Sequence, residues 1–124
     1  MLTWQVTLVL MFLGHLVADY TLQGWLADGK QKKWWDKCFD GKTPDKYKDD
    51  YKAALYCHAL YWSILVCAPF YASRYFLPAI MLNTLLHADI DDLKANEFKI
   101  NLMQDQLLHL LQILATFGIL ITTI

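Results

Sequence analysis

Charged residues are scarce in this chain of 124 residues, and basic residues are absent from most of its length. Charged side chains make up 19% of the sequence and hydrophobic ones 56%, whereas a soluble domain typically has about 25% and about 45–50%. Of the 11 Lys and Arg residues, most are gathered between Lys30 and Lys52. Because the net charge is −1 and no basic face remains outside this cluster, the sequence predicts no nucleic-acid partner.

Cysteine is also rare. Cys38, Cys57 and Cys67 give an odd number and no C-x-x-C spacing, which predicts reduced thiols and no disulfide framework. The apolar N-terminus has neither a basic n-region nor a small-residue cleavage site, so we expect a retained helix there and not a cleaved signal peptide. Without a repeat or a low-complexity tract, the chain is expected to form a single domain over residues 1–124.

Long apolar runs occupy the rest of the sequence. They predict an all-α integral membrane protein, a four-helix bundle whose spans cover residues of about 2–27, 53–71, 76–91 and 100–123. The third run is short for a span. The polar link 28–52 mixes Lys with Trp34, Trp35 and Phe39, which is typical of a segment lying at the lipid head groups.

The orientation follows from the basic residues. The first and third links lie on one side of the predicted membrane and carry all of them except Arg74. The side rich in Lys is expected to be cytoplasmic, which places both termini outside.

Histidine occurs four times, always within an apolar run. Three of these residues are spaced four positions from an aspartate: His15 from Asp19, His87 from Asp91, and His109 from Asp105. This spacing places both side chains on one helix face. The same faces carry further polar residues, namely Gln23, Asn83, Asn101 and Gln112. An ionisable residue at the bilayer centre costs about 2.5–3.5 kcal/mol, so these stripes should face inward.

The order within each pair indicates a common depth. The first and third helices run towards the cytoplasm and read His then Asp, whereas the fourth runs away from it and reads Asp then His. Each Asp therefore lies nearer the cytoplasm, with its His about 6 Å deeper. His58 falls at a compatible depth, so the polar core is expected in the cytoplasmic half of the bundle.

Four His and three Asp suit a borderline divalent metal such as Zn²⁺, with Mn²⁺ or Fe²⁺ as alternatives. The set allows one ion with orienting partners or two ions about 3.5–4 Å apart. No E-x-x-H pair is present, which argues against a ferritin-type di-iron site. Two other interpretations stay open: hydrogen-bonded packing between helices and a proton relay through Asp and His. The predicted metal ligands are His15, Asp19, His58, His87, Asp91, Asp105 and His109.

The predicted metal ligands fall in four segments, Gly14–Gln23, Tyr56–Leu60, Leu86–Lys94 and Asp105–His109. Together these segments resemble the domain-of-unknown-function-3307 family, small membrane proteins of bacteria and their phages. The resemblance covers nearly the whole chain and implies a bacterial inner (cytoplasmic) membrane. Trp62 stands where many members have a second histidine. The family has no settled activity, and is similar in style to membrane-associated metal-dependent hydrolases.

The sequence hypothesis is a membrane-embedded metal-dependent hydrolase acting on a phosphoester or ester of a lipid or membrane-associated substrate. Asp19, Asp91 and Asp105 are the candidate catalytic carboxylates. Gln23, Asn83, Gln106 and Lys94 are candidates for orienting ligands or substrate, with Lys94 placed to attract an anionic head group. The alternatives are a non-enzymatic protein that binds or transports a metal ion or proton, and a phage-type effector acting on a host partner. Membrane lipid is the expected partner, and a homo-oligomer stays open.

Overall fold

A computed structural model describes residues 2–124, and every regular element in this range is a helix. The α-helices are α1 (Trp4–Leu16), α2 (Leu26–Gly29), α3 (Lys32–Cys38), α4 (Asp50–Cys67), α5 (Phe76–Ala95) and α6 (Leu102–Leu120). The shorter turns are the π-helical η1 (Val17–Thr21) and the 3-10 turns η2 (Asp45–Tyr47), η3 (Ala68–Phe70) and η4 (Ile121–Thr123). The predicted all-α class is confirmed.

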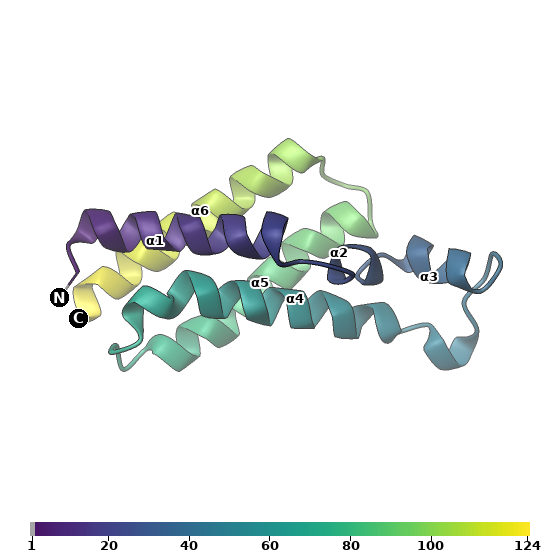
Figure 1. Cartoon of the computed structure of the whole chain (residues 1–124), viewed down its shortest axis with the longest axis horizontal. Coiled ribbons are helices and arrows are strands. Elements are labelled where there is room, and N and C mark those ends of the chain that lie inside the picture. Colours follow the sequence, from purple (N-terminus) through teal and green to yellow (C-terminus); the bar gives the residue numbers. More distant parts are fainter. Residues whose placement is uncertain (1) are drawn as a thin grey trace.

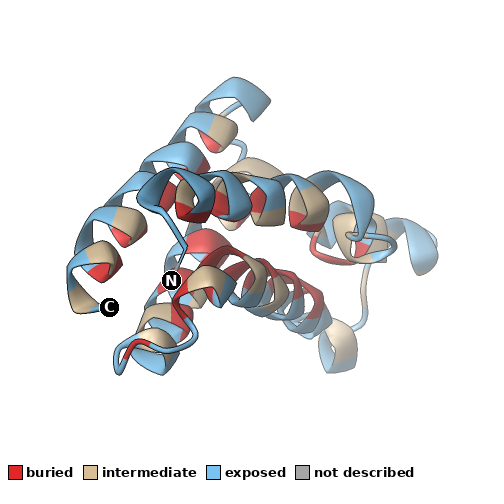
Figure 2. Cartoon of the chain, turned by 60° about the vertical axis from the view of Figure 1, so that its left-hand side comes forward, coloured by how far each residue is buried: buried red, intermediate tan, exposed pale blue. Residues whose placement is uncertain are grey.

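The four long helices surround a common interior. α1 packs on α4, α4 on α5, α5 on α6, and α6 closes the ring on α1. Both termini lie at one end of the molecule, and the α2–α3 segment lies at the other (Figure 1). Buried residues form inward-facing stripes on these helices, while their outer faces are exposed (Figure 2).

The first helix ends earlier than the sequence predicts. We expected one helix over about residues 2–27, but the helical run stops at Thr21 and a short α2 follows. Gly24 lies between them with φ +55°, a left-handed conformation that glycine adopts without a steric penalty. The chain therefore turns here, and α2 folds against α4.

The third long helix continues one turn further than predicted, to Ala95 in place of residue 91. Asn96 stabilises this end, because its Nδ2 donates to Asp92 Oδ1 at 2.7 Å and to the Lys30 carbonyl at 2.9 Å. Lys94 in the last turn is also favoured by the helix dipole. The extra turn carries Lys94 to the end of the polar interior.

Within residues 2–124, two helical runs are long and apolar enough to cross a membrane, Asp45–Phe70 and Leu102–Thr123. The other two long helices, α1 and α5, are shorter or more charged. α1 has 13 residues, fewer than the roughly 20 that a hydrocarbon core requires. α5 has 20 residues but carries four charged side chains in its last seven positions, Asp89, Asp91, Asp92 and Lys94.

An apolar core fills the end of the bundle near the termini. It contains Met11, Ala18, Trp62, Val66, Phe70, Ile113 and Leu120, all at most 2% exposed. α1 and α4 come unusually close beside this core, because a Cβ added to Gly14 would lie 2.8 Å from the Leu65 carbonyl oxygen. Small residues allow such contacts between helices. This packing fixes the height of His15 relative to α4.

Candidate metal centre

The seven predicted ligands lie in one continuous cluster at the inner face of four helices. Neighbouring members are 3.1–3.7 Å apart in the order His15, Asp19, His58, His87, Asp91, His109, Asp105. All seven side chains are at most 8% exposed. The predicted convergence of the His and Asp residues is therefore present in the structure.

Asp19 is placed by the π-helical turn η1. The Leu22 amide donates to the Val17 carbonyl at 2.9 Å, a hydrogen bond across five residues. A π turn widens the helix by one residue, and such turns are frequent at functional sites. It brings Asp19 Oδ1 within 3.2 Å of His58 Nε2 and 3.7 Å of His87 Nε2 on two other helices.

Asp19, His58 and His87 form a group whose ligand atoms could hold a metal ion. The two Nε2 atoms are 3.1 Å apart, so the three edges measure 3.1, 3.2 and 3.7 Å. Ligand atoms bound at about 2.0–2.1 Å to a tetrahedral Zn²⁺ lie about 3.3 Å from one another. Within the described residues, Asp19 Oδ1 is buried and has no hydrogen-bond partner. These atoms therefore fit a divalent cation.

A second group shares His87 and adds Asp91 and His109. Its carboxylate is already neutralised: Asp91 Oδ1 lies 3.1 Å from His109 Nε2, and Oδ2 accepts a hydrogen bond of 2.6 Å from Lys30 Nζ. The rings of His87 and His109 stack with centroids 4.0 Å apart. The first group is the better metal site, because its carboxylate oxygen has no such competing cation.

His15 takes part in the cluster differently from the other histidines. Its Nδ1 accepts a 3.0 Å hydrogen bond from Trp62 Nε1, and its Nε2 lies 3.1 Å from Gln106 Oε1. An indole N–H can only donate, so this ring is neutral, with its proton on Nε2. Both nitrogens are thus engaged, and His15 belongs to neither ligand group.

Asp105 also lies outside both groups. Lys94 Nζ donates to its Oδ2 at 2.8 Å, and Gln106 Nε2 donates to the same oxygen at 3.0 Å. Gln106 Nε2 also lies 3.4 Å from Asp19 Oδ2. Gln106 therefore connects Asp19, Asp105 and His15, as an orienting residue would.

The remaining orienting candidates lie at the edges of the cluster. Gln23 Nε2 donates to the Asp19 carbonyl oxygen at 2.7 Å, which holds the end of η1. Asn83 lies one turn away from His87 and accepts hydrogen bonds from Gln112 at 2.8 Å and Thr116 at 3.1 Å. Asn83 thus joins α5 to α6 and makes no hydrogen bond to the seven His and Asp side chains.

Two residues at the site were not anticipated from the sequence. Trp62 is fully buried, donates to His15, and stacks on His87 with ring centroids 4.3 Å apart. Its position four residues after His58 on the same helix face was the available signal. Lys30 belongs to the link that we expected to lie at the head groups, yet it is only 6% exposed. No sequence pattern distinguished it from the other lysines of that link.

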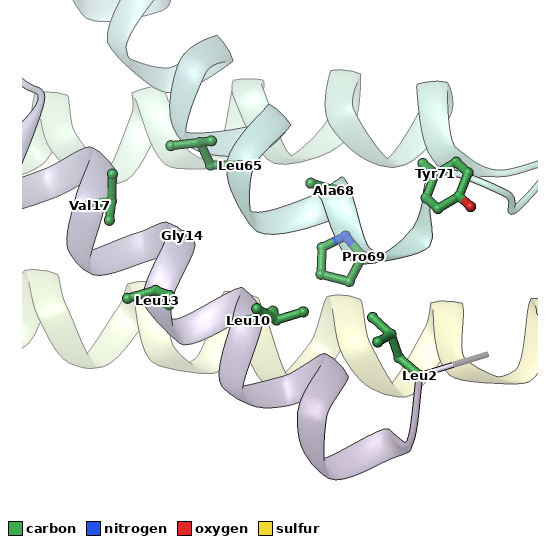
Figure 3. Close-up of a pocket in the computed structure, with 9 residues that line it drawn as sticks. All are labelled: Leu2, Leu10, Leu13, Gly14, Val17, Leu65, Ala68, Pro69 and Tyr71. Carbon is green, nitrogen blue, oxygen red and sulfur yellow. The ribbon is translucent and has the colours of Figure 1, made fainter.

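A groove of about 390 Å³ on the half of the molecule nearer the termini contains none of the cluster residues. It lies between α1 and the end of α4, with Leu10, Leu13 and Val17 on one side and Leu65 and Pro69 on the other (Figure 3). Its lining contains no His, Asp or Lys. The lining is apolar apart from the Tyr71 hydroxyl (Figure 3).

Comparison of the chain with protein-family models, with curated proteins and with solved structures finds no match. The family resemblance of the four sequence segments therefore stays a prediction.

Proposed function

We propose that this chain is a membrane-embedded, metal-dependent hydrolase of phosphoesters or esters. The observation that carries the proposal is the group formed by Asp19, His58 and His87. It combines a buried carboxylate oxygen that has no hydrogen-bond partner among the described residues with two nitrogens at metal-ligand spacing. A buried carboxylate oxygen that accepts no hydrogen bond is costly, and a divalent ion would compensate its charge.

The outer surface supports a membrane location. Large hydrophobic side chains are exposed along all four long helices, for example Val9 at 64%, Leu77 at 69%, Met81 at 70% and Ile119 at 65%. Monomeric soluble proteins rarely expose apolar patches larger than a few hundred Å². Two helical runs suffice to span the bilayer by length and composition. We propose a multi-pass protein of the bacterial inner membrane with the link 28–52 inside and both termini outside, since the termini lie at one end (Figure 1).

In the proposed reaction His58, His87 and Asp19 would hold one ion, and Zn²⁺ suits this donor set. When bound, the ion supplies a water-derived nucleophile at neutral pH. Asp105 Oδ1 is buried, lies 3.4 Å from His109 Nε2 and has no hydrogen-bond partner within residues 2–124. Asp105 is therefore the candidate to accept a proton.

Hydrolysis is favoured over transport because the interior is closed towards the termini. A transport site must open alternately to both sides of the membrane. Here the polar cluster ends against Trp62, and the fully buried Met11, Val66, Phe70 and Ile113 fill the space beyond it. This apolar barrier on the side of the termini supports a His and Asp site that opens towards the link alone.

The test uses protein reconstituted in liposomes and a panel of lipid and soluble phosphoesters and esters. We expect turnover that needs a divalent metal and falls about 100-fold or more in Asp19→Asn, with no metal flux across the liposome. The matched control is Asp89→Asn, an exposed aspartate of α5, which should retain activity. Metal flux that depends on Asp19, without hydrolysis of any substrate, would instead establish the transport alternative.

A further inference from the structure

A pocket of about 310 Å³ lies at the link end of the bundle, and two of its lining residues, Lys30 and Lys94, make hydrogen bonds to aspartates of the His and Asp cluster. Two lysines, two glutamines and a phenylalanine line it together with two alanines: Lys30, Lys94, Gln23, Gln31 and Phe98. Its volume is at the lower limit for small-ligand pockets, which is about 300 Å³. We call it the mouth pocket.

The two lysines connect the mouth pocket to the site. Lys30 donates one hydrogen bond to Asp91 and Lys94 donates one to Asp105. An ammonium group has three N–H donors, so each lysine keeps donors for a ligand in the pocket. Lysine acts as a point charge towards phosphate. The arrangement therefore suits an anion that reaches towards the carboxylates.

Both lysines are held in place by the fold. Asn96 Nδ2 donates to the Lys30 carbonyl oxygen at 2.9 Å, and Asn96 Oδ1 accepts from the Lys32 amide at 2.7 Å. These bonds join the junction between α2 and α3 to the end of α5, the helix that carries Lys94. The two ammonium groups are thus positioned before any ligand arrives, which lowers the entropic cost of binding.

The charges around the mouth pocket favour an anionic ligand only when a metal ion is bound. The two lysine ammoniums pair with Asp91 and Asp105, and Asp19 adds a third carboxylate to the same cluster. Without a metal ion, the lysines therefore provide no surplus of positive charge for an anionic ligand. A divalent ion at Asp19 adds two positive charges near the pocket. Charges buried in a protein interact much more strongly than in water.

We propose that the mouth pocket binds the phosphoryl group of a phosphoester substrate, and that it does so only after a divalent ion has bound at the metal centre. This inference rests on the proposed function and narrows its substrate class from esters in general to phosphoesters. Phe98 is 72% exposed at the pocket rim, so the rest of the substrate would leave the pocket past an apolar side chain. A lipid head group and a soluble phosphoester share this chemistry.

The test measures binding of glycerol phosphate by calorimetry to protein in phosphatidylcholine nanodiscs, with and without Zn²⁺, and determines bound zinc in the same samples. We expect Zn²⁺ to tighten glycerol phosphate binding at least about tenfold, because the ion adds an attractive charge interaction in a partly buried site. Lys94→Gln should abolish most of this gain and Lys94→Arg should retain it. The control is Lys99→Gln, because Lys99 is exposed, pairs with Glu97 and does not line the pocket.

The outcomes separate the two proposals. If the protein binds zinc but zinc does not raise its affinity for glycerol phosphate, the mouth-pocket proposal is wrong and the metal-centre proposal is unaffected. The same holds if zinc raises the affinity equally in Lys94→Gln. Absence of bound zinc overturns both. Nanodiscs containing phosphatidic acid identify the source: competition with glycerol phosphate supports a lipid head group, whereas glycerol phosphate binding without competition supports a soluble phosphoester.

Discussion

Lys30 Nζ lies 2.6 Å from Asp91 Oδ2, and both side chains are almost fully buried, at 8% and 2% exposed. The lysine comes from the end of α2 and the aspartate from α5, so this ion pair attaches the polar link to the centre of the bundle. Asp91 Oδ2 is also 3.4 Å from His58 Nε2. Lys30 therefore supplies positive charge at a position where a metal ion would otherwise be needed to neutralise Asp91.

Removal of Lys30 should destabilise the protein because it leaves a buried carboxylate without its cation. Breaking a buried ion pair typically costs about 3–5 kcal/mol. We expect Lys30→Met to lower the unfolding free energy in mild detergent by about this amount in metal-free buffer, and Zn²⁺ to restore part of it. The exposed Lys33→Met is the control. The double variant Lys30→Met/Asp91→Asn should be more stable than Lys30→Met alone, and equal stability would contradict a direct pair.

Metal binding should distinguish His87 from His15. His87 belongs to both ligand groups, so His87→Ala is expected to abolish stoichiometric metal in the purified protein. His15 has both ring nitrogens engaged by Trp62 and Gln106, so His15→Ala should keep most of the metal while it lowers stability. Mass-spectrometric metal analysis checks both variants. Complete loss of metal in His15→Ala with a normally folded protein would assign His15 as a ligand.

The convergence of His and Asp could be predicted because it depends only on helix geometry and on the cost of polar groups in lipid. A spacing of four residues defines a face, and the reversed order in the last helix defines a common depth. Periodicity does not say how far along the face contacts extend. Asn83 lies on the same helix face as His87, but one turn away from it. At that distance Asn83 bonds to Gln112 and to none of the seven His and Asp side chains.

The contributions of Lys30 and Trp62 could not be predicted, for different reasons. Lys30 reaches the site only because the chain turns at Gly24 and Asn96 fixes the end of α2, and both are tertiary effects. Trp62 shares a helix face with His58, but its contact with His15 on another helix has no sign in the sequence, because Trp is also common at membrane interfaces. The π turn at Asp19 likewise has no pattern in the sequence, although it determines which atoms meet.

The orientation of the chain can be tested with reporter fusions. Ten of the 11 Lys and Arg residues lie in the stretches 30–52 and 94–99, at the end of the bundle opposite the termini, which predicts a cytoplasmic position for that end. A phosphatase reporter, active outside the cytoplasm, should be active when fused after Ile124 and inactive when inserted at Lys42 in the first link. A fluorescent reporter that folds in the cytoplasm should give the opposite pattern. A cytoplasmic C-terminus would place the mouth pocket on the outer side.

The close contact between α1 and α4 predicts that Gly14 tolerates no side chain. A Cβ at this position would lie 2.8 Å from the Leu65 carbonyl oxygen and 3.3 Å from the Val66 amide nitrogen, both backbone atoms that cannot rotate away. Overpacking of this kind costs about 1–3 kcal/mol, so Gly14→Ala should lower the unfolding free energy by that amount. It should also weaken metal binding, because the shift of α1 moves Asp19 relative to His58.

Gly118→Ala is the matched control, since a Cβ added to Gly118 would meet no neighbouring residue within 4 Å. Alanine in a helix is favoured over glycine by about 1 kcal/mol. Equal stability of the two variants would show that the helices do not approach at Gly14, whereas loss of metal in Gly14→Ala alone would show that this contact sets the geometry of the centre.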